Sequence, residues 1–153
     1  AKTKGLGEII NDRHLTLRTS VIGPELKANG EELFHWFMSQ NSEINGYTKS
    51  IWSGVTTLVL AKAVEWAIIK NITGLYHITN NSRIDKSSLL SLLKVHTKKN
   101  ILILPIKGKE SDKSFKDTRK LIDFKIPNYD SMVKEMIEYI HENKNIYSQY
   151  FKK

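Results

Sequence analysis

A predicted β-strand that ends in a Gly-Pro turn constrains the fold of this chain most strongly. Residues 15–21 are rich in apolar and β-branched side chains, which favours a buried strand. Gly23 and Pro24 follow Ile22 directly and stop regular structure there. In an open α/β sheet, ligands bind just outside the carboxyl ends of the strands. If residues 15–21 form such a strand, residues 20–25 lie where a ligand would bind.

The composition indicates one folded domain. The chain has 153 residues, of which 40% are hydrophobic, so it is long enough to bury a core. It has no cysteine, which excludes disulfides and thiolate chemistry and suits the reducing cytoplasm. No apolar run approaches the roughly 18–20 residues that a membrane span needs. We therefore expect a cytoplasmic protein with no membrane partner.

The net charge of +8 permits binding to phosphorylated ligands or polyanions. The lysines are spread along the whole chain, however, which is typical of a solvated basic surface. No helix-turn-helix pattern and no interleaving of aromatic and basic residues accompanies the charge. We therefore expect no nucleic-acid partner. A filter-binding assay against DNA and RNA would test this expectation.

Helices and strands are predicted to alternate along the chain, which is typical of the α/β class. The polar stretch 41–50 is expected to be irregular, with a turn at Asn45 and Gly46. Residues 107–117 are expected to form a long charged loop, and residues 115–124 to include a short helix. The expected helices are 1–10, 31–40, 57–70, 85–97 and one that starts after Pro127; the expected strands are 15–21, 51–53, 75–79 and 101–106.

Two of the helices carry clear packing patterns. The helix at 57–70 is apolar on nearly all sides, so we expect it to be buried centrally. Thr56 or Thr57 is expected to cap it, and Asp85 to cap the next helix. The last helix has one apolar stripe, and the tail after it either frays or docks through its aromatic residues. The stripe consists of Tyr129, Met132, Val133, Met136, Ile137 and Ile140, and the tail aromatics are Tyr147, Tyr150 and Phe151.

Common catalytic motifs are missing. Gly5 and Gly7 lack the third glycine and the preceding strand of a dinucleotide-binding fingerprint. No histidine pair has the spacing of a metal site, so we expect no metal. His77 alternates with apolar residues and is expected to be a packed strand histidine. Ser20 alone does not indicate nucleophilic catalysis, because no base is placed beside it by the sequence.

Three segments in this order resemble a known family. Residues 4–8 read Lys-Gly-Leu-Gly-Glu, residues 18–24 read Arg-Thr-Ser-Val-Ile-Gly-Pro, and residues 74–80 read Gly-Leu-Tyr-His-Ile-Thr-Asn. Together they resemble the C-terminal half of an extended short-chain dehydrogenase/reductase, of the dTDP-4-dehydrorhamnose reductase type. The resemblance implies a Rossmann-type α/β fold with a small mixed sheet and flanking helices. Residues 1–153 would then comprise the end of the cofactor domain and the substrate-binding lobe, without the glycine-rich half.

The resemblance also implies roles for individual residues. Lys4 falls on the lysine of the family's Tyr-x-x-x-Lys motif, whose tyrosine would stand immediately before Ala1. In the family that lysine lowers the pKa of the tyrosine, the general acid of hydride transfer, and binds the nicotinamide ribose. The residues implied to bind NAD or NADP are Lys4, Thr19, Ser20 and Val21. Those implied to bind a nucleotide-sugar are Glu25, Lys49, Trp52 and Lys113. Lys113 stands where many members of the family have an arginine.

The resemblance leaves several functions open. The first is reduction of a 4-keto-6-deoxy sugar nucleotide, as part of a longer NAD(P)-dependent enzyme. An epimerase or dehydratase of the same fold is an alternative, and so is a non-catalytic module that binds a nucleotide-sugar or a partner. Because the tyrosine and the glycine-rich half are absent, we expect the chain alone to be inactive. Apolar surface left uncovered by the missing half would favour a homo-oligomer.

Overall fold

The computed structural model describes residues 2–117 and 123–151. Its helices and strands alternate, as expected for the α/β class. The helices are α1 (Lys2–Leu6), α2 (Leu33–Ser39), α3 (Thr57–Ile69), α4 (Lys86–Thr97), α5 (Tyr129–Glu142) and the 3-10 turn η1 (Ser148–Tyr150). The strands are β1 (Leu15–Arg18), β2 (Val21–Ile22), β3 (Glu43–Tyr47), β4 (Ser50–Trp52), β5 (Val55–Thr56), β6 (Gly74–His77), β7 (Ile84–Asp85), β8 (Leu102–Ile106) and β9 (Ser111–Lys113).

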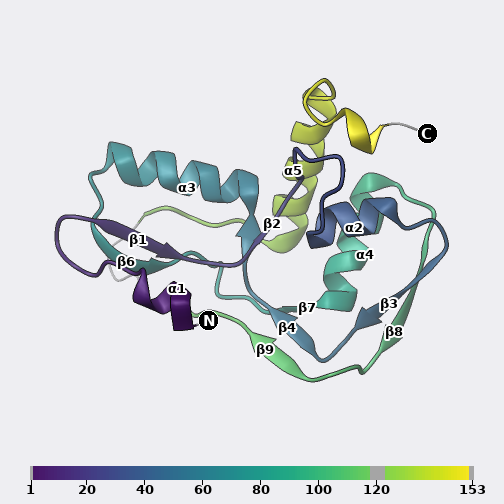
Figure 1. Cartoon of the computed structure of the whole chain (residues 1–153), viewed down its shortest axis with the longest axis horizontal. Helices are drawn as coiled ribbons and strands as arrows, with labels where there is room; N and C mark the ends of the chain where they lie inside the picture. Colours follow the sequence, from purple (N-terminus) through teal and green to yellow (C-terminus); the bar gives the residue numbers. More distant parts are fainter. Residues whose placement is uncertain (1, 118–122, 152–153) are drawn as a thin grey trace.

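The strands form four small sheets. Three are parallel pairs, β1 with β6, β2 with β5 and β3 with β8. In the fourth sheet, β4 lies between antiparallel β7 and parallel β9. In Figure 1, α3 lies above the β1–β6 pair and α1 below it, while α2, α4 and α5 occupy the other end of the molecule. The small mixed sheets with flanking helices match the predicted fold class.

Two buried clusters form the core. One joins α2, α4 and α5 through side chains such as Phe37, Leu93 and Met136, and the other joins α3 to α5 through Val59 and Met132. Trp52 packs against both clusters. All six stripe residues of α5 are buried, which confirms the pattern predicted for the last helix. This helix therefore holds the two ends of the molecule together.

The caps predicted for α3 and α4 are confirmed. The side chain of Thr56 accepts a hydrogen bond from the backbone N–H of Val59 at the start of α3. Asp85 caps α4, and Asn128 caps α5, each by accepting from the backbone N–H three residues later. Each cap satisfies an N–H that the first helical turn leaves unpaired.

The C-terminal tail docks rather than frays. Tyr150 packs edge-on against Phe34, with ring centroids 5.2 Å apart. Its hydroxyl accepts a hydrogen bond from the backbone N–H of Glu25 at 2.9 Å, and the Gln149 side chain donates to the Glu25 carbonyl at 2.6 Å. The tail thereby holds the loop that follows β2.

The turn predicted at Asn45 and Gly46 is wrong, because both residues lie within β3. Gly46 is buried against α4, and a Cβ placed there would lie 2.5 Å from the Ser87 hydroxyl oxygen. The glycine lets α4 approach the strand, and parallel pairing with β8 supplies the backbone hydrogen bonds. Pro105 in β8 lies on the edge of this two-stranded sheet, where a missing N–H is tolerated.

Three further predictions need correction. The first helix ends at Leu6 rather than Ile10, and the strand predicted at 15–21 breaks after Arg18, because β2 leaves β6 to pair with β5. The charged loop at 107–117 contains β9, which pairs with β4. In the predicted helix at 115–124, residues 118–122 lie outside the described residues, and the described residues on either side are not helical.

The expectation that α3 is buried on all sides is wrong. Only Val59, Ala63 and Ala67 are buried on this helix. On its outer face Ile68 and Ile69 are each 70% exposed, because the described part of the chain covers only one side of α3.

Among the described helices, none is long and apolar enough to cross a membrane.

The packing of α4 predicts the effect of a truncation in its core. Leu93 is 0% exposed, so Leu93→Ala leaves a cavity and should lower the free energy of unfolding by about 2–5 kcal/mol. Urea denaturation monitored by circular dichroism measures this change. Val95→Ala on the same helix is the matched control, since Val95 is 65% exposed and should lose less than about 0.5 kcal/mol. Equal losses in both variants would contradict the packing described.

Candidate functional site

The candidate site lies at the carboxyl ends of β1 and β6. The two strands are parallel, and their last residues, Arg18 and His77, are paired in the register. Both strands therefore end at the same edge, where ligands bind in open α/β sheets. Three of the four predicted cofactor residues, Thr19, Ser20 and Val21, follow directly after Arg18.

The turn after β1 is held by bonds to two other strands. The Thr19 hydroxyl donates to the carbonyl of Ile78, just beyond β6, at 2.8 Å. The backbone N–H of Val55 donates to the Ser20 carbonyl at 2.9 Å. Val21 then starts β2 with its side chain 47% exposed. Thr19, Ser20 and Val21 are thus held in place, and the Val21 side chain is partly exposed to solvent.

Gly54 makes the closest approach to this turn. A Cβ at this position would lie 1.9 Å from the Ser20 carbonyl oxygen and 2.2 Å from the Trp52 ring. Neither neighbour is a flexible chain end, so no side chain fits. The glycine is therefore required where the end of β4 meets the turn.

An ion pair ties the N-terminal segment to the same edge. The Arg18 Nε donates to a carboxylate oxygen of Glu8 at 2.7 Å, and Nη2 pairs with the second oxygen. The hydrogen bonds from Arg18 hold the pKa of Glu8 below its usual value, and the carboxylate raises the pKa of Arg18. Lys4 lies in α1, ahead of Glu8, but its side chain lies outside the described part of the structure.

The predicted substrate residues divide into two groups. Trp52 and Lys113 are register partners in the parallel β4–β9 pair. The carbonyl of Lys49 accepts a backbone hydrogen bond from Ser111 at 3.1 Å, which extends the β4–β9 pairing at the start of β4. Glu25 lies elsewhere: its carboxylate accepts from the backbone N–H of Glu32 at 2.7 Å, and the C-terminal tail holds its backbone.

Trp52 is only partly available to a ligand. Its ring is half-buried and lies 5.8 Å from the Tyr129 ring, centroid to centroid. Burial raises the pKa of Tyr129 to about 12, and its hydroxyl donates to the Ser82 carbonyl at 2.7 Å. Tyr129 therefore stays neutral at physiological pH and serves the core, while Lys49 and Lys113 are exposed beside the tryptophan.

His77 packs against the segment after β9, as the sequence predicts. Its Nδ1 donates to the Lys116 carbonyl at 2.9 Å, since a carbonyl only accepts. Its ring meets Phe115 edge-on at 5.4 Å. Its Nε2 is buried and has no hydrogen-bond partner among the described residues.

Sequence reasoning missed several residues at this site. Ser53 is fully buried and bonds to the backbone of Phe115, which is 62 residues away in sequence. No local pattern marks such a pair. A neighbouring cavity of about 350 Å³ is bordered by an ion pair of Arg83 with Asp112, and its lining comprises Asn81, Arg83, Ser114, Phe115, Lys116 and Asp117. The sequence indicated only that residues 107–117 are rich in charged side chains.

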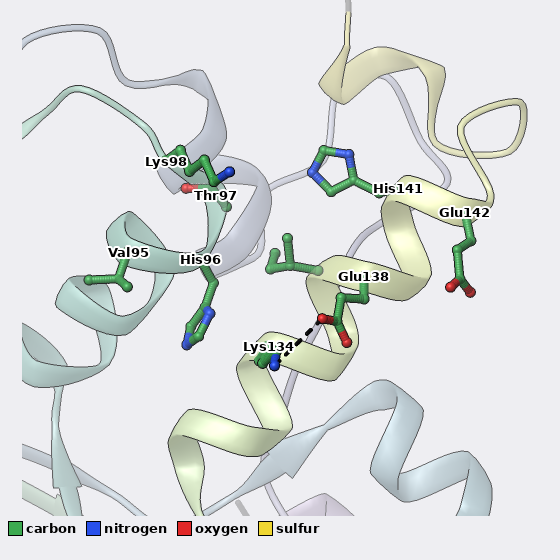
Figure 2. A pocket seen from close by; sticks show the side chains of 9 residues that line it. Val95, His96, Thr97, Lys98, Lys134, Glu138, His141 and Glu142 are labelled. Carbon is green, nitrogen blue, oxygen red and sulfur yellow. Dashed lines mark ion pairs between the residues drawn. The ribbon is translucent and has the colours of Figure 1, made fainter.

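A larger groove of about 580 Å³ lies between the C-terminal halves of α4 and α5 (Figure 2). Among its lining residues, His96 bonds to Asp130 outside the groove at 2.8 Å, and Lys134 pairs with Glu138 at 3.9 Å. Within residues 2–117 and 123–151, no three side chains are grouped to hold a metal ion. The groove shares no residue with the predicted site.

Solved structures share this fold. The dTDP-4-dehydrorhamnose reductase from Bacillus anthracis, in complex with NADP, is 14% identical and superposes with a TM-score of 0.67 over 83% of this chain and 48% of its own. The fold resemblance predicted from the sequence is confirmed. The reductase from Yersinia enterocolitica gives a TM-score of 0.66 at 17% identity, over 82% of this chain and 49% of its own.

The likeness extends beyond reductases. The dTDP-glucose 4,6-dehydratase from Bacillus anthracis, in complex with NAD, has a TM-score of 0.58 at 10% identity, over 89% of this chain and 47% of its own. No protein-family model and no curated protein matches the sequence. The chain therefore has the Rossmann-type fold of these proteins and spans about half of their length.

The Glu8–Arg18 pair predicts a measurable pKa change. Replacing Arg18→Gln removes the hydrogen bonds that lower the pKa of Glu8, so that pKa should rise toward its ordinary value. A carbon-13 NMR titration of the Glu8 carboxyl group measures it. Arg83→Gln is the control, because Arg83 pairs with Asp112 and should leave Glu8 unchanged.

The same pair gives a pH dependence with a defined sign. Because the folded-state pKa of Glu8 is lowered, the pair contributes stability above the ordinary carboxyl pKa. That contribution is lost as the pH falls through the lowered value. An Arg18→Gln protein with an unchanged Glu8 titration would contradict the pairing.

Proposed function

We propose that this chain is the nucleotide-sugar-binding half of an NAD(P)-dependent oxidoreductase that reduces a 4-keto-6-deoxy sugar nucleotide. One observation carries the proposal: the turn at residues 19–21 and the β4–β9 pair with Trp52 and Lys113 are joined through the adjacent residues Ser53 and Gly54. A cofactor turn and a substrate surface must be neighbours for hydride transfer. The similar folds of a reductase and a dehydratase support this reading.

The residues fit part of such a site. The exposed side chain of Val21 and the fixed backbone at Thr19 and Ser20 offer a rigid wall for a nicotinamide ring. When bound, the nicotinamide cofactor supplies or accepts the hydride. Lys4 is proposed to bind the ribose and to lower the pKa of a tyrosine supplied just before Ala1.

On the substrate side, Trp52 is proposed to stack against the base or sugar, and Lys49 and Lys113 to neutralise the diphosphate. A lysine provides a positive charge but cannot form the bidentate hydrogen bonds of an arginine. Specificity for the diphosphate therefore depends on where the lysine ammonium groups stand. Glu25 belongs to this proposal only through the resemblance, since it is engaged with the loop and the C-terminal tail. The proposed domain is 1–153, the end of a cofactor domain plus a substrate lobe.

The chain by itself is proposed to be inactive. Burial raises the pKa of Tyr129, Tyr147 and Tyr150, so none of these three phenols is activated as an acid near neutral pH. Activity therefore requires the tyrosine and a glycine-rich cofactor half. We further propose a cytoplasmic location, and a homo-oligomer that would cover the outer face of α3.

Reduction differs from epimerisation and dehydration in that it consumes NAD(P)H. A protein that joins this chain to a cofactor-binding half should consume one NAD(P)H for each 4-keto sugar nucleotide reduced, measured by absorbance and product analysis. An epimerase or dehydratase returns the hydride and consumes none. Epimerised or dehydrated product without net consumption would contradict the reductase assignment, and binding without any turnover would favour a non-catalytic module.

Binding to this chain can be tested directly. Thymidine diphosphate should bind the 153-residue chain, and Lys113→Ala should weaken the binding by about 10- to 100-fold, since a charged hydrogen bond is worth about 1.5–3 kcal/mol. Isothermal titration calorimetry measures both. Lys144→Ala is a charge-matched control, because Lys144 lies over the Phe151 ring in the C-terminal tail. A wild-type chain that does not bind thymidine diphosphate would contradict the proposed function.

A further inference from the structure

Ser53 has an unusual pair of hydrogen bonds. Its side chain is fully buried, and its hydroxyl oxygen accepts from the backbone N–H of Phe115 at 2.5 Å. The same hydroxyl donates to the Phe115 carbonyl at 3.2 Å. Both polar groups of one backbone residue are thus satisfied by one buried side chain. Loss of the Ser53 hydroxyl would leave the N–H and the carbonyl of the half-buried Phe115 without these partners, which costs free energy.

The residues next to Ser53 are fixed to the opposite loop. Gly54 touches the Ser20 carbonyl so closely that a Cβ would lie 1.9 Å from its oxygen. Val55 donates its N–H to the same oxygen at 2.9 Å. Residues 53–55 therefore form a short joint with the turn at Ser20 on one side and Phe115 on the other.

The segment 113–117 carries the exposed cations Lys113 and Lys116, one on either side of Phe115. Two further bonds hold it: His77 donates to the Lys116 carbonyl, and the Asn81 side chain accepts from the backbone N–H of Asp117 at 2.6 Å. The hydrogen bonds between Ser53 and Phe115 hold the middle of the segment. The cavity of about 350 Å³ is lined by the same stretch of backbone.

We infer that Ser53 is a positioning residue for nucleotide-sugar binding, because its hydroxyl fixes the segment 113–117 relative to the turn at Ser20. The role rests on the proposed function. Ser53 itself is buried and touches no ligand. It acts by setting where the ammonium groups of Lys113 and Lys116 stand relative to the turn.

The joint can be tested in the wild-type chain by amide hydrogen exchange. The N–H groups of Ser114 and Phe115 are both hydrogen-bonded, but the Asp112 acceptor of Ser114 is exposed and the Ser53 acceptor of Phe115 is buried. After correction for intrinsic rates, Phe115 should exchange about tenfold more slowly than Ser114. Equal rates would overturn the inference without any variant.

Ser53→Ala tests the role in binding. It should accelerate exchange at Phe115 and weaken thymidine diphosphate about tenfold, with circular dichroism as the check on folding. Ser50→Ala is the matched control: it removes a hydroxyl pair with Ser111 between β4 and β9, the strands that precede Ser53 and Phe115, and leaves Phe115 untouched. Its exchange at Phe115 and its affinity should equal those of the wild type.

The outcomes separate this inference from the proposed function. If the wild-type chain binds thymidine diphosphate and Ser53→Ala binds it equally well, the positioning role is overturned and the proposed function stands. The same holds if exchange rises while affinity does not change, because Ser53 is then merely structural. If the wild type does not bind, the proposed function itself fails, and the positioning role falls with it.

Discussion

The structure depends on the contact between Gly54 and the carbonyl of Ser20. At this point the chain passes from the β1–β6 pair to the β2–β5 pair, and the end of β4 meets the turn between them. The missing side chain of Gly54 permits the approach, and the hydrogen bond from Val55 secures it. The separate small sheets keep a fixed relation because this junction and α5 connect them.

Packing and the candidate site are linked through Trp52. Its ring contacts both buried clusters, and its backbone pairs with Lys113 in β9. The core therefore holds the exposed lysines in place. The outer face of α3, in contrast, is not packed against the core. Ile68 and Ile69 remain exposed to water, and full burial of each side chain would contribute about 1.5–3 kcal/mol of stability. A chain spanning half of its neighbours' length is expected to leave such a face.

Periodicity and capping residues predicted the elements that pack locally. The stripe of α5 and the caps at Thr56 and Asp85 depend on residues three or four apart, and all are confirmed. The strand β3 was missed because its glycine is explained only by α4, which follows about forty residues later. The fold resemblance came from three ordered motifs and is confirmed by the solved structures, whereas the roles of the individual site residues remain predictions.

The central claim concerns where a nucleoside diphosphate binds. A crystal structure of the chain grown with thymidine diphosphate tests it most directly. The account predicts the diphosphate beside the β4–β9 pair, within reach of the Lys113 ammonium group, with the base or sugar against Trp52. A diphosphate bound instead in the groove between α4 and α5, with none beside the β4–β9 pair, would contradict this claim.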